Sequence, residues 1–280
     1  MPIKLIAVDM DGTFLNNQQD YDRERFRKQY LRMKEEGIRF VVASGNQYFQ
    51  LKSFFGEFQD EITYVAENGA FVVDQGEELF SANIPGEVVK AVTEEILQHT
   101  QISVVLCGKE SAYVLESLPE ESFGIINRYY HRLKRVTTFD VVDDQILKFA
   151  LACPFEETEG LLELLQSKIG MYMTPVSSGH GDIDLILPGC HKAAGIELLQ
   201  EKWGLNPGEM MAFGDGGNDI EMLRHVSYSF AMENGSEAVK EIAKYIAPPN
   251  TNNGVLEVID QYFDKQGPFA NEKQVMMDAF

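Results

Sequence analysis

The chain has 280 residues, of which 44% are hydrophobic and 24% are charged, and this composition excludes collagen-like, low-complexity and disordered proteins. Asp and Glu outnumber Lys and Arg by 44 to 24, so the net charge is −20. Most of such a surface repels a polyanion, which argues against a nucleic-acid-binding protein. The three cysteines are far apart and form no CxxC pair, so they indicate neither a disulfide framework nor a zinc site, and they suit a reducing compartment.

No segment of the sequence predicts a membrane span or a signal peptide. The first apolar run, residues 5–8, is too short for a signal-peptide core. No later run approaches the length of about 18 apolar residues that a membrane helix needs. We therefore expect a cytoplasmic protein without nucleic-acid or membrane partners, either a monomer or a weak homo-oligomer.

Apolar runs alternate with helical segments at the beginning of the chain. Each run is continuously apolar, which is typical of strands buried on both faces of a sheet. This βαβαβ order predicts a parallel, doubly wound sheet with right-handed crossovers. The expected strands are 3–8, 38–43 and 62–66, the helices between them are 22–36 and one that ends at 55, and a hairpin pairs 70–73 with 78–80.

The rhythm changes after about residue 82 and returns after residue 188. Paired strands separated by helices in the middle part predict an α+β insert with a largely antiparallel sheet. We therefore predict an α/β protein with a core of residues 1–82 and 188–280 and an inserted cap of residues 83–187. The insert has expected helices 88–98, 120–130 and 156–169 and strands 102–107, 113–115, 147–151, 171–176 and 183–187; the returning core has helices 191–203, 217–223, 237–242 and 255–263 and strands 210–213 and 228–231.

Two acidic motifs each follow a buried strand. Asp9-Met10-Asp11-Gly12-Thr13 ends the first strand, and the run GDGGND, residues 214–219, follows the strand 210–213. Ligands of open α/β sheets bind at the carboxyl ends of the strands, so we expect both acidic motifs to face one crevice. Carboxylates crowded in this way repel one another unless a divalent cation compensates them, although a DG turn with solvated acids is the common alternative for one motif alone.

Two further segments offer partners for a phosphate group. Ser44-Gly45-Asn46 provides a hydroxyl and backbone N–H groups at the start of a helix, where phosphate oxygens bind well. Read alone, it is more often an ordinary helix cap. Lys192 stands in the first turn of another helix, where a cation opposes the helix dipole.

Together these four segments, in this order, resemble the haloacid dehalogenase-like (HAD) phosphatase superfamily, and DMDGT with GDGGND is a specific pair. The position of the cap and the run VAENGA are similar to the Cof-type branch, which has a large α/β (C2B) cap on a Rossmann-like HAD core. The runs FVVASGNQY and GDGGNDIEML are similar to those of a bacterial sugar phosphatase in that branch. Asn46 stands where the superfamily usually has an arginine, as it does in that sugar phosphatase group.

The resemblance implies a phosphoric monoester hydrolase that acts on a small phosphorylated metabolite, in particular a sugar phosphate. It implies that Asp9 attacks phosphorus and forms an aspartyl-phosphate, and that Asp11 is the general acid and then the general base. Mg²⁺ would be held by the Asp9 carboxylate, the Asp11 main-chain carbonyl and Asp215. Asp219 would orient Lys192 or a metal-bound water.

The same resemblance implies a set of phosphate-binding groups. Lys192, as a catalytic cation, and Ser44 would contact phosphoryl oxygens, with help from backbone N–H groups near Met10 and Gly45 and from Asn218. A phosphomutase would share the aspartyl-phosphate step, and an inactive phosphosugar-binding regulator would keep only the binding site. Both remain alternatives to the phosphatase.

Two segments of the cap have an ambiguous pattern. The polar turn of residues 177–182 is equally consistent with a substrate-facing loop and an exposed hairpin, and its His180 receives no catalytic role. The basic run of residues 128–135 is more typical of a solvated helix end than of a site for a second phosphate.

Overall fold

The computed structural model describes residues 2–99, 102–179 and 181–270. The described chain forms two compact units. The first comprises residues of Met1–Val41, Gln200–Asp215 and Asp219–Phe280, and the second comprises Val42–Leu199 and Gly216–Asn218. No helix in the described ranges is long and apolar enough to cross a membrane.

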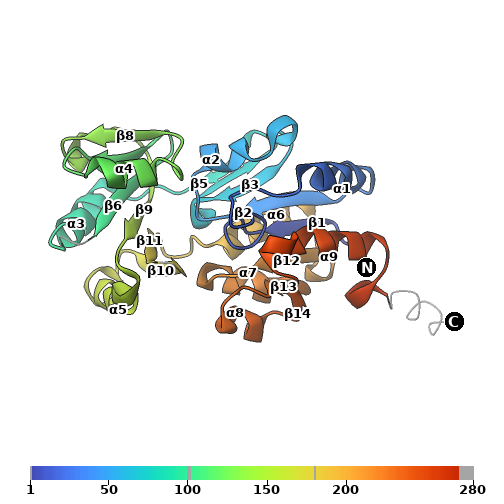
Figure 1. Cartoon of the computed structure of the whole chain (residues 1–280). Helices are drawn as coiled ribbons and strands as arrows, with labels where there is room; N and C mark the ends of the chain where they lie inside the picture. Colours follow the sequence, from blue (N-terminus) through green and yellow to red (C-terminus); the bar gives the residue numbers. More distant parts are fainter. Residues whose placement is uncertain (1, 100–101, 180, 271–280) are drawn as a thin grey trace. The chain divides into compact units, whose positions relative to one another are not determined.

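The first unit contains a sheet with the strand order β14-β13-β12-β1-β2. Strand β1 pairs in parallel with β12, β12 with β13, and β13 with β14. Every residue of β1 and β12 is buried, as the continuous apolar runs predict. The strands are β1 (Leu5–Val8), β2 (Arg39–Ala43), β12 (Met210–Gly214), β13 (Tyr228–Met232) and β14 (Tyr245–Ala247), and the helices are α1 (Arg23–Glu35), α7 (Ile220–His225), α8 (Glu237–Ile242) and α9 (Gly254–Phe263) (Figure 1).

The second unit begins within β2 and continues the strand order β2-β3-β4-β5. Strands β3, β4 and β5 are successively antiparallel, which confirms the predicted hairpin. Helix α6 begins at Lys192 in this unit, where the His191 Nδ1 atom accepts a hydrogen bond of 3.0 Å from the Ala194 N–H. These elements are β3 (Thr63–Ala66), β4 (Phe71–Asp74), β5 (Glu77–Ser81), α2 (Tyr48–Ser53) and α6 (Lys192–Trp203).

The second unit also contains a separate sheet with the strand order β10-β11-β9-β6-β7-β8. Its neighbouring strands are antiparallel except for β7 and β8, which are parallel. The sheet is therefore largely antiparallel, as predicted. The strands are β6 (Ser103–Gly108), β7 (Ala112–Leu115), β8 (Leu133–Val136), β9 (Ile146–Ala152), β10 (Thr174–Gly179) and β11 (Asp182–Ile186), and the helices are α3 (Gly86–Ile96), α4 (Glu120–Ile126) and α5 (Thr158–Ile169).

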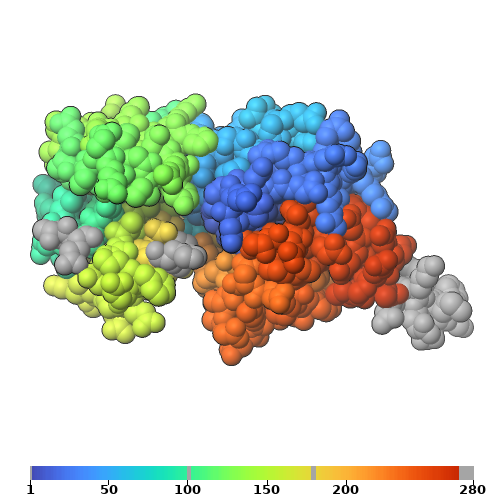
Figure 2. All heavy atoms as spheres, viewed as in Figure 1, coloured from blue at the N-terminus to red at the C-terminus, as the bar shows by residue number. Residues whose placement is uncertain are grey.

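Helices cover both faces of this separate sheet. On one face, Ile96 of α3 and Leu165 of α5 belong to the apolar cluster that contains Phe149 of β9. On the other face, Phe123 of α4 packs against the cluster that contains Cys107 of β6. Helix α5 leaves its polar side exposed at the surface, where it is yellow-green in Figure 2.

The structure corrects two details of the sequence prediction. The helix expected at 120–130 ends at Ile126, and the basic run after it leads into strand β8 instead of ending a helix. Strand β14 was also not predicted. Both strands lie at the edge of a sheet and are short and partly exposed, so they lack the apolar run or alternation that marks a strand in a sequence. The predicted α/β fold class is confirmed.

Short 3₁₀ turns join many of the elements. They are Gly56–Phe58, Glu67–Gly69, Phe139–Val141, Phe155–Glu157, Pro207–Glu209, Gly217–Asp219, Asn250–Asn252 and Gly267–Phe269.

Candidate active site

The two acidic motifs of the sequence are brought together by the pairing of β1 with β12. Val8 lies opposite Phe213 in the parallel ladder, and the Asp9 N–H donates to the Phe213 carbonyl at 3.1 Å. The chain therefore leaves both strands at the same edge of the sheet. This geometry confirms that the acidic motifs share one strand-end edge.

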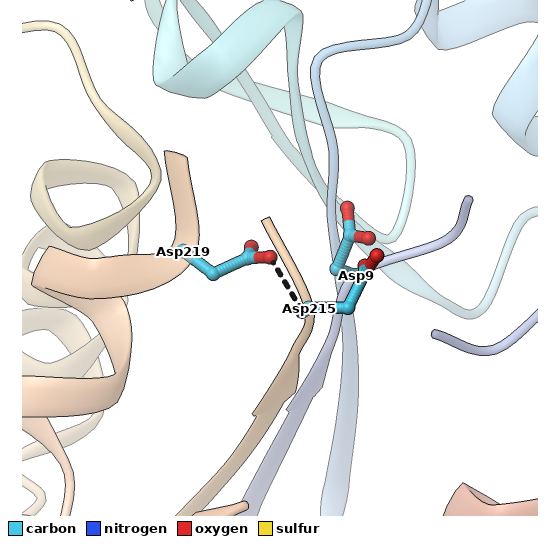
Figure 3. Close-up of side chains that lie close together, drawn as sticks. All are labelled: Asp9, Asp215 and Asp219. Atoms are coloured by element: carbon cyan, nitrogen blue, oxygen red, sulfur yellow. Dashed lines mark hydrogen bonds between the residues drawn. The ribbon is translucent and has the colours of Figure 1, made fainter. Parts of the chain in front are cut away.

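Carboxylate oxygens of Asp9, Asp215 and Asp219 gather at this edge. One oxygen from each residue lies within 4.8 Å of the others, and Asp9 and Asp219 are only 6% and 0% exposed (Figure 3). Two oxygens on opposite sides of a Mg²⁺ ion are about 4.2 Å apart, since each bond is about 2.1 Å long. The donor set and its spacing fit a hard divalent cation, which would also offset the repulsion among the buried charges.

Gly12 and Thr13 shape the position of the Asp215 carboxylate. The Thr13 hydroxyl donates to Asp215 Oδ1 at 2.7 Å. Gly12 has a φ of +74°, and a Cβ atom there would collide with the Asp215 carboxylate. The Gly12 carbonyl accepts a hydrogen bond of 2.7 Å from the Asn234 amide. The Asp-Gly-Thr sequence therefore forms a close-fitting support for the second acidic motif.

Asp219 is tied to the same motif from the other side. Its Oδ2 atom accepts the Asp215 N–H at 3.0 Å, the hydrogen bond drawn in Figure 3. Gly214 is needed here because a Cβ atom would lie 2.5 Å from the Asp219 side chain. The carboxylate of Asp219 belongs to the acidic cluster, so it is close enough to contact a bound cation or one of that cation's ligands.

The other residues predicted for the first motif lie beside this cluster. Asp11 is partly buried, and its predicted contribution to a metal is its carbonyl oxygen. Met10 is fully buried, and its carbonyl accepts the N–H groups of Thr13 and Leu15 at 3.3 Å and 2.9 Å. The Met10 carbonyl is therefore already hydrogen-bonded within the turn, and the group predicted to contact phosphate is the backbone N–H.

The predicted phosphate-binding residues of the second unit are closely connected to Asn68. The Ser44 carbonyl accepts the Asn68 N–H at 3.0 Å. The Asn218 Nδ2 atom donates to Asn68 Oδ1 at 3.0 Å. A Cβ atom on Gly45 would lie 3.1 Å from Asn68 Nδ2. The structure thus brings Ser44, Gly45 and Asn218 together, and Lys192 is 1% exposed at the start of α6 in the same unit.

Sequence reasoning assigned no role to a buried charged group in the second unit. Lys148 of β9 is 1% exposed, and its ammonium lies 2.7 Å from Asp184 Oδ1 and 3.4 Å from Glu67 Oε2. Burial raises the pKa of Glu67 to about 7, although Lys148 lowers it and Asp184 raises it. The available signal was the single lysine in the apolar run ILKFALA, because a buried ammonium needs an acidic partner.

The two ambiguous cap segments differ in how far the structure describes them. In the basic run, the Arg135 guanidinium donates to the Leu118 carbonyl at 2.8 Å and to the Glu120 carboxylate at 2.7 Å. The Arg132 Cζ atom lies over the Phe49 ring, 3.5 Å from the ring centroid. The polar turn joins β10 to β11, but His180 lies outside the described residues.

Residues 6–259 match the haloacid dehalogenase-like hydrolase family. The chain is 49% identical over 269 residues to 5-amino-6-(5-phospho-D-ribitylamino)uracil phosphatase YbjI of Escherichia coli K12, with 96% of this chain and 99% of the relative covered. It is 26% identical over 260 residues to YcsE of Bacillus subtilis 168, which has the same enzyme name. This match covers 92% of this chain and 94% of the relative.

A solved structure agrees with these matches. The structure of SMU.1108c from Streptococcus mutans UA159 superimposes with a TM-score of 0.90 at 35% identity and covers 94% of this chain and 99% of that one. The predicted family and enzyme class are confirmed, and the chain belongs to the haloacid dehalogenase-like hydrolase family as a phosphoric monoester hydrolase.

Proposed function

We propose that this protein is a Mg²⁺-dependent phosphatase that hydrolyses small phosphorylated metabolites through an aspartyl-phosphate on Asp9. The cluster of Asp9, Asp215 and Asp219, with oxygens within 4.8 Å of one another, carries this proposal. A reactive carboxylate beside a cation-binding cluster is what phosphoryl transfer to a protein oxygen requires.

Two carboxylates divide the chemical work. Asp9 attacks phosphorus, and the bond between phosphorus and the ester oxygen breaks while Asp11 gives its proton to the departing alcohol. Asp11 then takes a proton from water, whose oxygen attacks the aspartyl-phosphate and releases inorganic phosphate and free Asp9. The 6% exposure of Asp9 supports this role, because a nucleophile shielded from water reacts with phosphorus without a competing solvation shell.

The Asp9 carboxylate, the Asp11 main-chain carbonyl and the Asp215 carboxylate would hold Mg²⁺. The ion would offset the negative charge of these groups and of the phosphoryl group. The hydrogen bonds that fix Asp215, from Thr13 at 2.7 Å and to Asp219 at 3.0 Å, support its role as a ligand of defined orientation. Asp219 would orient Lys192 or a metal-bound water.

The phosphoryl oxygens would be bound by a second group of residues. We assign this role to the Lys192 ammonium, the Ser44 hydroxyl, the Asn218 amide and the backbone N–H groups of Met10 and Gly45. Lys192 adds positive charge, which matters in a chain whose net charge is −20.

The substrate class is a phosphate ester at the end of a sugar or sugar-alcohol chain. The name of the E. coli relative supports this choice, because a 5-phosphoribityl group is a phosphorylated sugar alcohol. We propose that residues 83–187 act as the cap that selects the alcohol part, while 1–82 and 188–280 form the catalytic core. The separate, largely antiparallel sheet formed within residues 103–186 supports this division.

We further propose that the enzyme acts in the cytoplasm, as a monomer or a weak homo-oligomer. Its three cysteines are free thiols, which is the usual state in a reducing compartment.

A phosphate-release assay tests the proposed function. The panel contains 5-amino-6-(5-phospho-D-ribitylamino)uracil, hexose and pentose phosphates, flavin mononucleotide and an aryl phosphate, each with Mg²⁺ or with EDTA. We expect release from sugar or ribityl phosphates only with Mg²⁺, and a fall to background in Asp9→Asn. The exposed Asp60→Asn is the matched control. Turnover of Asp9→Asn near the wild-type rate, or wild-type release in EDTA, would contradict the proposal.

A further inference from the structure

A buried ionic network connects β9 and β11 to the turns proposed to bind phosphate. The Lys148 ammonium donates to Asp184 Oδ1 and to the Gly45 carbonyl, both at 2.7 Å. All members of this Lys148 network lie in the second unit. An ammonium buried to 1% exposure is costly unless it is fully paired, so the Gly45 carbonyl is held by a strong, charge-assisted donor.

The network holds all three carbonyls of the Ser44-Gly45-Asn46 turn. The Ser44 carbonyl accepts the Asn68 N–H at 3.0 Å, and the Asn46 carbonyl accepts the Glu67 N–H at 3.2 Å. Lys148 binds the Gly45 carbonyl between them. In a planar trans peptide, the C=O and the following N–H point in opposite directions. The hydrogen bond from Asn68 therefore aims the Gly45 N–H away from Asn68. The Lys148 bond to the Gly45 carbonyl aims the next N–H, that of Asn46, which donates to Ser44 Oγ at 3.1 Å.

The same network sets the direction of two side-chain amides. Lys148 can only donate hydrogen bonds, and the ionised Asp184 can only accept them. The Asn68 Nδ2 atom donates to Asp184 Oδ2 at 2.5 Å, which turns Asn68 Oδ1 toward Asn218. Asn218 must then present its Nδ2 to Asn68, as it does at 3.0 Å. The charge of Lys148 thus determines an amide orientation three side chains away.

There is little room for this arrangement to relax. A Cβ atom on Gly45 would lie 3.1 Å from both Asn68 Nδ2 and Asp184 Oδ2. Asn68 has a φ of +55°, a left-handed conformation that asparagine, aspartate and glycine tolerate best. The turn and the network are therefore closely packed parts of one arrangement.

We propose that Lys148 and Asp184 are positioning residues, which hold the Ser44-Gly45-Asn46 turn through the Gly45 carbonyl and set the Asn218 amide for binding phosphate, without touching the substrate. This inference rests on the proposed function, which assigns Gly45 and Asn218 to the phosphoryl group. Two residues of the insert thereby control the affinity of the site for phosphate itself, in addition to any contact that the insert makes with the alcohol.

The test measures the Kd of inorganic phosphate by titration calorimetry with Mg²⁺ present, alongside kcat and KM for the best ester. In Asp184→Asn, the new NH₂ group faces the NH₂ group of Asn68, so one of the two amides must turn. In Asn68→Gly, the side chain that joins Asp184 to Asn218 is removed, while the left-handed backbone conformation is kept. We expect phosphate to bind at least about tenfold more weakly in both, which is the loss of roughly one hydrogen bond to a charged ligand. Circular dichroism confirms that each variant is folded at the temperature of the titration.

The swapped double variant Asp184→Asn with Asn68→Asp distinguishes orientation from mere stability. It exchanges the amide and the carboxylate, keeps the net charge and again gives Asn218 Nδ2 an acceptor. We expect it to recover phosphate affinity to within about threefold of the wild type, because the donor and acceptor pattern is restored. Two matched controls should bind phosphate as the wild type does. Asp60→Asn removes a carboxylate from an exposed ion pair, with Lys52 at 2.6 Å. Asn253→Gly replaces another asparagine in the left-handed conformation, at a φ of +54°.

The outcomes separate this inference from the proposed function. Three results would overturn the positioning role. The first is wild-type phosphate affinity in folded Asp184→Asn and Asn68→Gly. The others are no recovery of affinity in the swapped variant and no phosphate binding by the wild type. Phosphate binding without hydrolysis of any ester would overturn the proposed function instead, and the affinities of the variants would still decide the positioning role.

Discussion

Gly12 shows how a single residue can determine the geometry of the acidic cluster. Its φ of +74° lies in the left-handed region, and a Cβ atom would collide with the Asp215 carboxylate. Two separate requirements, backbone conformation and close approach, therefore both call for glycine at this position.

We predict that Gly12→Ala displaces the Asp215 carboxylate and lowers both Mg²⁺ affinity and kcat, in addition to a backbone cost of about 1–2 kcal/mol. Gly76→Ala is the matched control, because Gly76 has a φ of +83° with nothing within 4 Å of the added atom. Kinetics at a series of Mg²⁺ concentrations and thermal unfolding measure the two effects. Equal losses of kcat in both variants would show that backbone strain alone is responsible.

At the scale of elements, the Glu67 side chain links the turn after β3 to Lys148 of β9. The turn Glu67–Gly69 places its carboxylate at 2% exposure, 3.4 Å from the ammonium. Burial raises its pKa from 4.5 to about 7, even though Lys148 acts in the opposite direction. The packing of this turn against β9 should therefore depend on pH.

We predict that the stability of Glu67→Gln rises relative to that of the wild type as the pH rises. The folded state binds the Glu67 proton more tightly than the unfolded state does, so the stability from this proton is present below about pH 4.5 and is lost as the pH rises through about 7. The difference in Tm, variant minus wild type, should be larger at pH 8 than at pH 5. Glu87→Gln, at an exposed position of α3, controls for general charge effects. A pH-independent difference for Glu67→Gln would contradict the prediction.

At the scale of the whole molecule, the net charge of −20 makes the chain sensitive to any cation. General screening by salt and specific binding at the acidic cluster must therefore be separated by experiment. Only specific binding depends on individual carboxylates.

We predict that Mg²⁺ raises the Tm of the wild type above its value in NaCl of equal ionic strength. A ligand at about 100 times its Kd adds about 2.7 kcal/mol to the stability of the folded state, which amounts to several degrees for a chain of this size. Asp215→Asn should lose this specific shift, whereas Asp60→Asn should keep it. Differential scanning calorimetry provides the measurement, and an unchanged shift in Asp215→Asn would place the ion elsewhere.

The acidic cluster could be predicted from the sequence because its information is local. Asp9 and Asp215 each follow a buried apolar run directly, and parallel strands end at a common edge, so two short motifs suffice to bring them together. The helix that begins after Asp22 was predictable for the same reason, since its cap lies three residues from the N–H that it accepts. Strands β8 and β14, which lie at sheet edges, lacked such a local pattern.

The amino-acid sequence by itself determined the fold class, the family and the residues of the acidic cluster, because these depend on contiguous motifs and on hydrophobic periodicity. Only the tertiary structure revealed the Lys148 network, in which Asp184 and Asn68 are 116 positions apart. A lysine in an apolar strand indicates that an acidic partner exists, but its identity depends on which strands and turns meet in the folded chain. Burial makes that pairing obligatory, and packing alone selects the partner.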